Sequence, residues 1–100
     1  MSRRLARQVA FQTLFQIDLA SSDVDTALEQ RLADIELDEE NREYVERVVR
    51  GVTEQQRAID NQIAAVSKGW HVHRLGFVDR SILRLAIYEI VFVDEVPVRV

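Results

Sequence analysis

Apolar residues recur three and four positions apart in five successive stretches of this chain, and this spacing restricts its fold more than any other feature. Residues at such spacing share one face of an α-helix. The 100 residues include only three glycines and one proline, so few positions interrupt helices. A chain of this length forms one hydrophobic core. We therefore expect a single all-α domain whose first two helices cover about Arg3–Ala20 and Val24–Ile35, with a cap for the second in residues 21–23.

The boundary between the third and fourth predicted helices lies near Gly51. The third helix begins at residues 38–40, where three acidic side chains favour a first turn. Gly51 is typical of a helix C-terminus, and residues 53–56 resemble a capping box that begins a fourth helix ending near Ser67. The alternative is one long helix, because the apolar stripe keeps its period across Gly51.

The fifth predicted helix, about Val78–Val93, is apolar in almost every direction. A helix of this kind is expected at the centre of a bundle. It ends before Pro97, whose ring disfavours helix at the preceding residue. Because only four other helices are available to cover it, we expect an uncovered patch around Ile87, Ile90 and Val91.

Charge is distributed unevenly along the chain, whose net charge is −4. Residues 1–17 contain three arginines and no acid, whereas residues 18–60 contain 13 acidic and five basic residues. Residues 61–100 contain four acidic and five basic residues. A basic segment on an acidic body can contact phosphates locally while the rest of the protein repels them.

One face of the first predicted helix carries Arg4, Arg7, Phe11 and Phe15 within about 80° of one another at about 100° per residue. Guanidinium groups neutralise phosphates, and aromatic rings stack on bases, so this mixture suits single-stranded RNA. The alternative is that both phenylalanines pack in the protein and that solvent surrounds the arginines.

Other kinds of site find little support in the sequence. The absence of cysteine excludes disulfides, thiolate metal sites and cysteine nucleophiles, and fits a cytoplasmic location. His71 and His73 lack a third ligand nearby, so we expect no metal site. No glycine-rich phosphate loop or hydrolase motif occurs, and no apolar run is long enough to span a membrane. We expect no enzymatic activity, no cofactor and no membrane contact.

The string VDRSILRLAIYEI at residues 78–90, with Trp70 and Arg74 before it and Pro97 after it, resembles the NusB family of transcription antitermination factors. The string RRLARQVAFQTLFQID at residues 3–18 is similar to that family's arginine-rich first helix, and EYVERVVRGV at residues 43–52 to its third. The resemblance covers essentially the whole chain. Because family members continue into two further helices, it implies one NusB-like domain over residues 1–100 without the family's C-terminal part.

The resemblance implies an antiparallel helical bundle of two small subdomains. It also implies binding of boxA-type RNA together with a small-subunit ribosomal protein, NusE, within the transcription elongation complex. By position, the residues that match RNA-facing sites of the family are Arg3, Arg4, Arg7 and Gln12. Phe15, where the family usually has tyrosine, and Asp79 match residues that face NusE.

We therefore expect a non-catalytic RNA-binding antitermination factor. The alternative is a helical protein-interaction domain, such as a homodimerising bundle or the accessory domain of a ribosomal-RNA cytosine methyltransferase. In that case the arginines of the first helix make no specific RNA contact.

Overall fold

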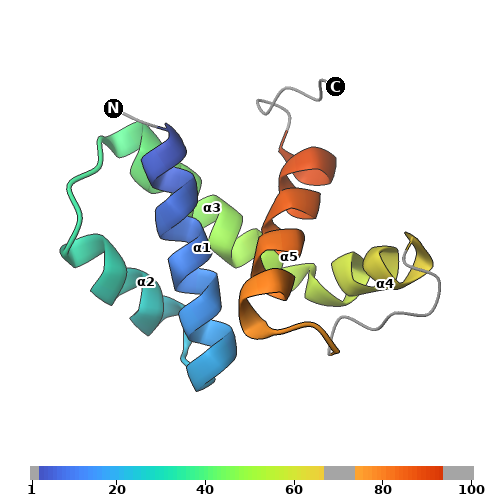
Figure 1. Cartoon of the computed structure of the whole chain (residues 1–100). Coiled ribbons are helices and arrows are strands. Elements are labelled where there is room, and N and C mark those ends of the chain that lie inside the picture. Colours follow the sequence, from blue (N-terminus) through green and yellow to red (C-terminus); the bar gives the residue numbers. More distant parts are fainter. Residues whose placement is uncertain (1–2, 67–73, 94–100) are drawn as a thin grey trace.

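The structure, a computed structural model, describes residues 3–66 and 74–93. Within these ranges it contains helices and no strand, which confirms the predicted all-α class (Figure 1). The helices are α1 (Arg3–Ala20), α2 (Val24–Ala33), α3 (Glu39–Glu54), α4 (Gln56–Val66) and α5 (Phe77–Phe92).

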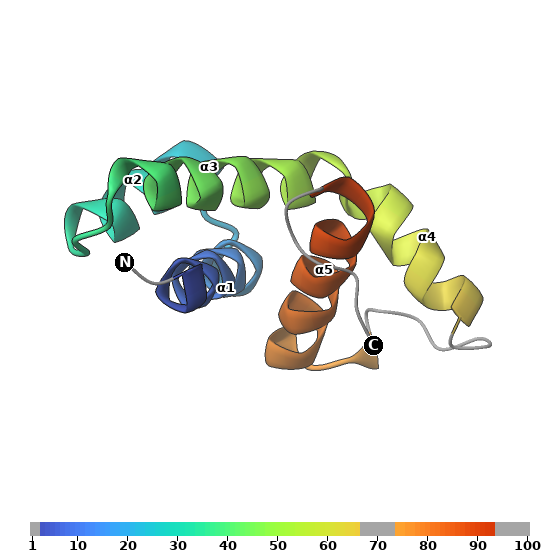
Figure 2. The same cartoon turned by 90° about the horizontal axis from the view of Figure 1, so that it is seen from above.

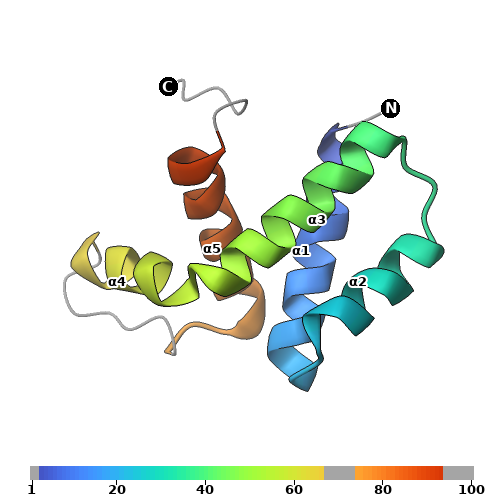
Figure 3. The same ribbon diagram turned by 180° about the vertical axis from the view of Figure 1, so that it is seen from behind.

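Helix α3 packs against each of the other four helices in the described part of the chain. It crosses α1, and α1 and α2 lie toward one of its ends while α4 and α5 lie toward the other (Figures 2 and 3). Helix α1 also packs directly against α5. These two small groups agree with the subdomains that the resemblance implies. The side chains of the shared core are Ala6, Val9, Ala10, Leu14, Leu28, Leu32, Tyr44, Val45, Val48, Val49, Val52, Ile59, Ile63, Leu85, Tyr88 and Val93.

The junction between α1 and α2 is closed by local hydrogen bonds. Ser21 adopts a positive φ of 53°, and the amide of Ser22 donates to the carbonyl of Ile17 at 3.2 Å, which satisfies an end carbonyl of α1. Asp23 is the N-cap of α2, and its carboxylate accepts from the amide of Thr26 at 3.0 Å. The cap predicted in residues 21–23 is confirmed.

Helix α2 ends at Ala33, two residues before the predicted Ile35. The amide of Asp34 donates back to the carbonyl of Arg31 at 3.3 Å, which closes the helix two residues early. Ile35 still packs against the core from outside the helix. The partly buried, apolar side chain of Ile35 fits the helical spacing that predicted α2, although Ile35 itself is not part of the helix.

The joint between α3 and α4 exists, but the predicted role of Gly51 is wrong. The break lies at Gln55, and Gly51 is buried within α3. A Cβ at Gly51 would overlap the ring of Tyr88 from α5, so close helix packing explains this glycine. The hydroxyl of Thr53 donates backward to the carbonyl of Val49 at 2.9 Å, which shows that no capping box begins there.

Helix α5 is not surrounded by other helices in the described part of the chain, so that prediction is wrong. Its apolar side chains Val78, Ile82, Leu83, Ile90 and Val91 are between 39% and 57% exposed. The exposure of Ile90 and Val91 agrees with the expected uncovered patch, whereas Ile87 packs against the core. The buried stripe of α5 is instead mostly polar: Ser81, Arg84, Leu85, Tyr88 and Glu89.

Some expectations concern residues 67–73 and 94–100, which lie outside the described residues. These include Trp70, His71, His73 and Pro97. Among residues 3–66 and 74–93, no group of three or more potential ligands is placed to hold a metal ion. No helix in those ranges is long and apolar enough to cross a membrane.

Candidate nucleic-acid and partner interface

A buried carboxylate from α5 binds an arginine near the N-terminal end of α1. Glu89 of α5 is 2% exposed, and it accepts hydrogen bonds from Arg7 Nε at 2.9 and 3.1 Å and from Arg7 Nη2 at 2.8 Å. The hydroxyl of Tyr44 in α3 donates to the same carboxylate. A buried carboxylate is costly unless it is paired and hydrogen-bonded. Contacts from two helices meet this need for Glu89.

The electrostatics keep both partners of Glu89 as donors. The hydrogen bond to Glu89 raises the pKa of Arg7, which therefore stays charged. Burial, together with the hydrogen bond to Glu89, raises the pKa of Tyr44, which therefore keeps its hydroxyl proton. The three groups form one stable arrangement at neutral pH.

Arg3 joins this arrangement through the ring of Tyr44. Its guanidinium carbon lies 3.9 Å from the ring centroid, and its Nη2 lies 3.7 Å from Oε2 of Glu40. Arg3, Tyr44, Glu89 and Arg7 therefore form a continuous series of contacts across α1, α3 and α5.

Arg4 is exposed beside Arg3, and it makes no ion pair or hydrogen bond to another described side chain. We call Arg3, Arg4 and Arg7 the arginine cluster. Gln12, the fourth predicted RNA residue, is half-buried and lies about 140° around α1 from Arg7. The structure thus links two of the four predicted residues, leaves Arg4 beside them, and does not bring Gln12 to the cluster.

Both phenylalanines of α1 are half-buried. The rings of Phe11 and Phe15 lie 6.2 Å apart at a tilt of 31°, and Phe11 packs against the core. The packing alternative is therefore correct for Phe11. It does not hold for the arginines as a group, because Arg7 pairs with a buried acid.

The predicted partner residues lie at the opposite end of α1. Asp18, one turn after Phe15, accepts from Arg80 Nε at 2.6 Å and from Arg80 Nη2 at 2.9 Å. This pair fixes the last turn of α1 against the first turn of α5, where Asp79 is exposed next to Arg80. Phe15 and Asp79 therefore belong to the same end of the molecule, away from the arginine cluster.

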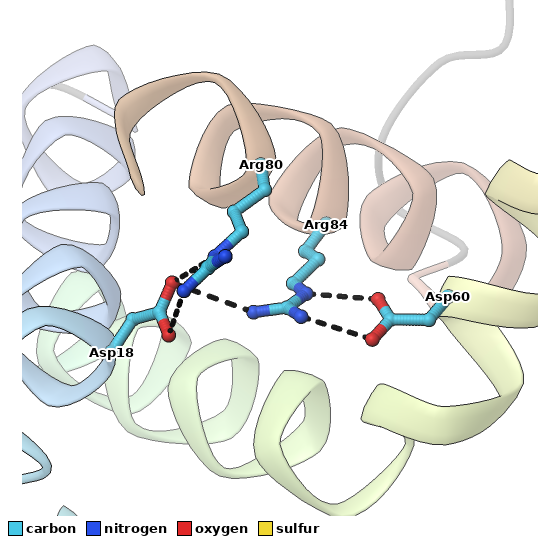
Figure 4. A network of polar contacts seen from close by, with 4 residues as sticks. All are labelled: Asp18, Asp60, Arg80 and Arg84. Carbon is cyan, nitrogen blue, oxygen red and sulfur yellow. Dashed lines mark hydrogen bonds and ion pairs between the residues drawn. The ribbon is translucent and has the colours of Figure 1, made fainter. Parts of the chain in front are cut away.

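A second arginine extends this contact to α4 (Figure 4). Arg84 Nε and Nη2 each donate to Asp60 at 2.9 Å, and Arg84 Nη1 lies 3.6 Å from Asp18. The Arg84 side chain is 5% exposed. The network of Asp18, Asp60, Arg80 and Arg84 therefore ties α1, α4 and α5 together in fixed positions.

Sequence reasoning missed Tyr44, Glu89 and this network. A signal was present, because Arg84 and Glu89 interrupt an otherwise apolar helix, and such charged residues are rarely buried unless paired. Their partners could not be found in the same way, since those partners lie on other helices.

Known proteins are similar to this chain in sequence and in the arrangement of their helices. Residues 4–100 match the NusB family. The transcription antitermination protein NusB of Symbiobacterium thermophilum is 46% identical over an alignment of 105 residues, gaps included. The alignment covers 97% of this chain and 69% of that protein. The protein of the same name from Bifidobacterium longum is 41% identical over 100 residues, which cover all of this chain and 53% of that protein.

Two solved structures agree at the level of the fold. T. maritima NusB superposes with a TM-score of 0.85 at 33% identity, covering 97% of this chain and 68% of that chain. A chain of the structure described as "Crystal Structure of a Plectonemic RNA Supercoil" also gives 0.85, at 30% identity, covering 94% of this chain and 70% of that chain. On sequence and on fold alike, this chain belongs to the NusB family.

Proposed function

We propose that the chain is a non-catalytic RNA-binding adaptor in transcription antitermination. The observation that carries the proposal is the arginine cluster on the first helix of a NusB-family chain, with Arg7 held by buried Glu89. The RNA class proposed is single-stranded boxA-type RNA. The proposed place of action is the elongation complex, and therefore the cytoplasm, where transcription takes place.

Three arginines support only weak RNA binding by the chain alone. Each phosphate contact with single-stranded nucleic acid changes log K by about 0.7 per unit of log salt, so three contacts give a slope of about −2. Binding with so few contacts is weak at physiological salt. We therefore propose a protein partner, the small-subunit ribosomal protein NusE, that binds at the Phe15 and Asp79 end.

The RNA site is tested with Arg4→Glu. Arg4 is exposed, so this change adds repulsion toward phosphate without disturbing the core. We expect weaker binding of boxA-type RNA in a fluorescence titration, with a salt slope smaller by about 0.7. Arg57→Glu, at an exposed position of α4, is the control with the same charge change. Equal affinity and slope for the two variants would remove RNA binding from the first helix.

The partner site is tested with Asp79→Lys. The expected result is lower affinity for the ribosomal protein by calorimetry, with RNA binding by the chain alone unchanged or stronger. Loss of an acid from the first turn of α5 also costs about 0.3–1 kcal/mol of stability, so melting curves accompany the titration. Glu29→Lys, at an exposed position of α2, is the control. Normal partner affinity for a folded Asp79→Lys variant would contradict the assignment.

One observation favours the alternative, a protein-interaction domain such as a homodimerising bundle. The exposed side chains of Ile82 and Ile90, at 51% and 57%, lie on the outer side of α5. Sedimentation equilibrium separates the two functions. A stable dimer whose RNA binding is unaffected by Arg4→Glu would support the alternative.

A further inference from the structure

We propose that Tyr44 and Glu89 are positioning residues for RNA, which hold Arg3 and Arg7 in fixed places before the RNA arrives. This inference rests on the RNA-binding function proposed above. It assigns a binding role to two buried residues that are themselves too enclosed to contact RNA, since each is 2% exposed.

The geometry of Arg7 carries the first step. Glu89 occupies the Nε and Nη2 edge of the guanidinium, and Nη1 is not part of that pair. The Arg7 side chain is 52% exposed although its partner is buried. A guanidinium held along one edge can present its other N–H groups to a phosphate in a defined direction.

Tyr44 links the two arginines, because it contacts Arg3 directly and also contacts Glu89, the partner of Arg7. Its hydroxyl donates to Glu89, while its ring lies under the guanidinium of Arg3. A change in the position of Tyr44 therefore changes the placement of Arg3 and of Glu89 together. The two arginines come from adjacent turns of α1, and the shared support fixes their separation as well as their directions.

Arginine side chains that are already held in place bind a phosphate more tightly than mobile ones. A long side chain loses conformational freedom when it binds a ligand, and prior fixation lowers that loss. The opposing effect is charge, since Glu89 reduces the positive potential around Arg7. These two effects predict opposite results when the charge of Glu89 is removed.

The deciding variant is Glu89→Gln, which keeps the size of the side chain. If Glu89 positions Arg7, affinity for a boxA-type RNA falls about fivefold to tenfold. If Glu89 only neutralises Arg7, affinity rises and the salt slope becomes steeper. Glu29→Gln, at an exposed position on α2, controls for the change in net charge.

A double-mutant cycle with Arg7→Gln shows whether Glu89 acts through Arg7. We expect Glu89→Gln to lower affinity in the natural sequence and to have no further effect in the Arg7→Gln background. A general loss of structure would lower affinity by the same factor in both backgrounds. Circular dichroism and thermal melting of each variant establish that it is folded at the assay temperature.

Tyr44→Phe gives a second, milder test if Glu89→Gln does not fold. It keeps the ring beneath Arg3 and removes only the hydroxyl that contacts Glu89, so we expect a loss of about twofold to fivefold. Unchanged or tighter RNA binding by a folded Glu89→Gln or Tyr44→Phe variant, with Arg4→Glu still defective, would overturn the positioning role and leave the RNA function standing. An Arg4→Glu variant without any defect would overturn the function itself.

Discussion

Replacing Gly51 by alanine should destabilise the protein, although the same change inside a helix usually stabilises it. Alanine is favoured over glycine in a helix interior by about 1 kcal/mol. Gly51 lies within α3, so secondary structure alone predicts a gain in stability. Its contact with Tyr88 predicts the opposite sign.

The magnitude follows from what the new methyl group would meet. The nearest atoms to an added Cβ are Oη, Cζ and Cε1 of Tyr88, all on one ring. That ring is 8% exposed and stacks on Phe92 with centroids 5.1 Å apart, so it cannot move without losing buried contacts. Overpacking costs about 1–3 kcal/mol, and full displacement of a buried aromatic ring costs about 3–5 kcal/mol. Subtracting the helix-propensity gain of about 1 kcal/mol from these costs leaves an expected net loss of up to about 4 kcal/mol.

Urea denaturation of Gly51→Ala, alone and combined with Tyr88→Leu, measures this effect. Leucine lacks all three of the contacting atoms, so in the Tyr88→Leu background the alanine should become neutral or stabilising. Gly76→Ala is a further control, because a Cβ there meets nothing within 4 Å. The reasoning is refuted if Gly51→Ala stabilises the natural sequence, or if its cost is the same in both backgrounds.

Two further predictions concern the buried polar groups. Asp60→Ala leaves the guanidinium of Arg84 buried with only the 3.6 Å contact to Asp18, and should lower the free energy of unfolding by about 3 kcal/mol in urea. Adding Arg84→Met should recover most of that loss, and no recovery would contradict a cost due to an unpaired charge. The raised pKa of Tyr44 means that the folded protein keeps a proton that the unfolded chain loses above about pH 10. The free energy of unfolding should therefore fall as pH rises beyond about 10, by up to about 1.4 kcal/mol per pH unit, and Tyr44→Phe should flatten that slope in melts across the pH range.

Helix positions were largely predictable because apolar spacing is a local property. The predicted bounds of α1 are those of the structure, and α5 differs by one residue at each end. The role of Gly51 was not predictable, since it depends on a ring from α5 that packs against it. A glycine that ends a helix and one that admits a neighbouring side chain give the same local pattern.

The buried face of α5 shows a second limit of local reasoning. Hydropathy places apolar side chains inside, but Arg84 and Glu89 are buried because Asp60 and Arg7 reach them from other helices. For the same reason, the arginines of α1 could be selected from the sequence as binding candidates, whereas the support of Arg7 by Glu89 required the fold.

The central claim, an adaptor that binds RNA together with a protein partner, is tested most directly by measuring RNA affinity with and without that partner. The chain, a boxA-type RNA and the small-subunit ribosomal protein NusE are mixed, and RNA binding is followed by fluorescence anisotropy with size-exclusion chromatography of the same mixture. The account predicts a co-eluting ternary complex in which RNA binds at least tenfold more tightly than to either protein alone. RNA affinity that is unchanged by the partner, with no ternary complex, would contradict it.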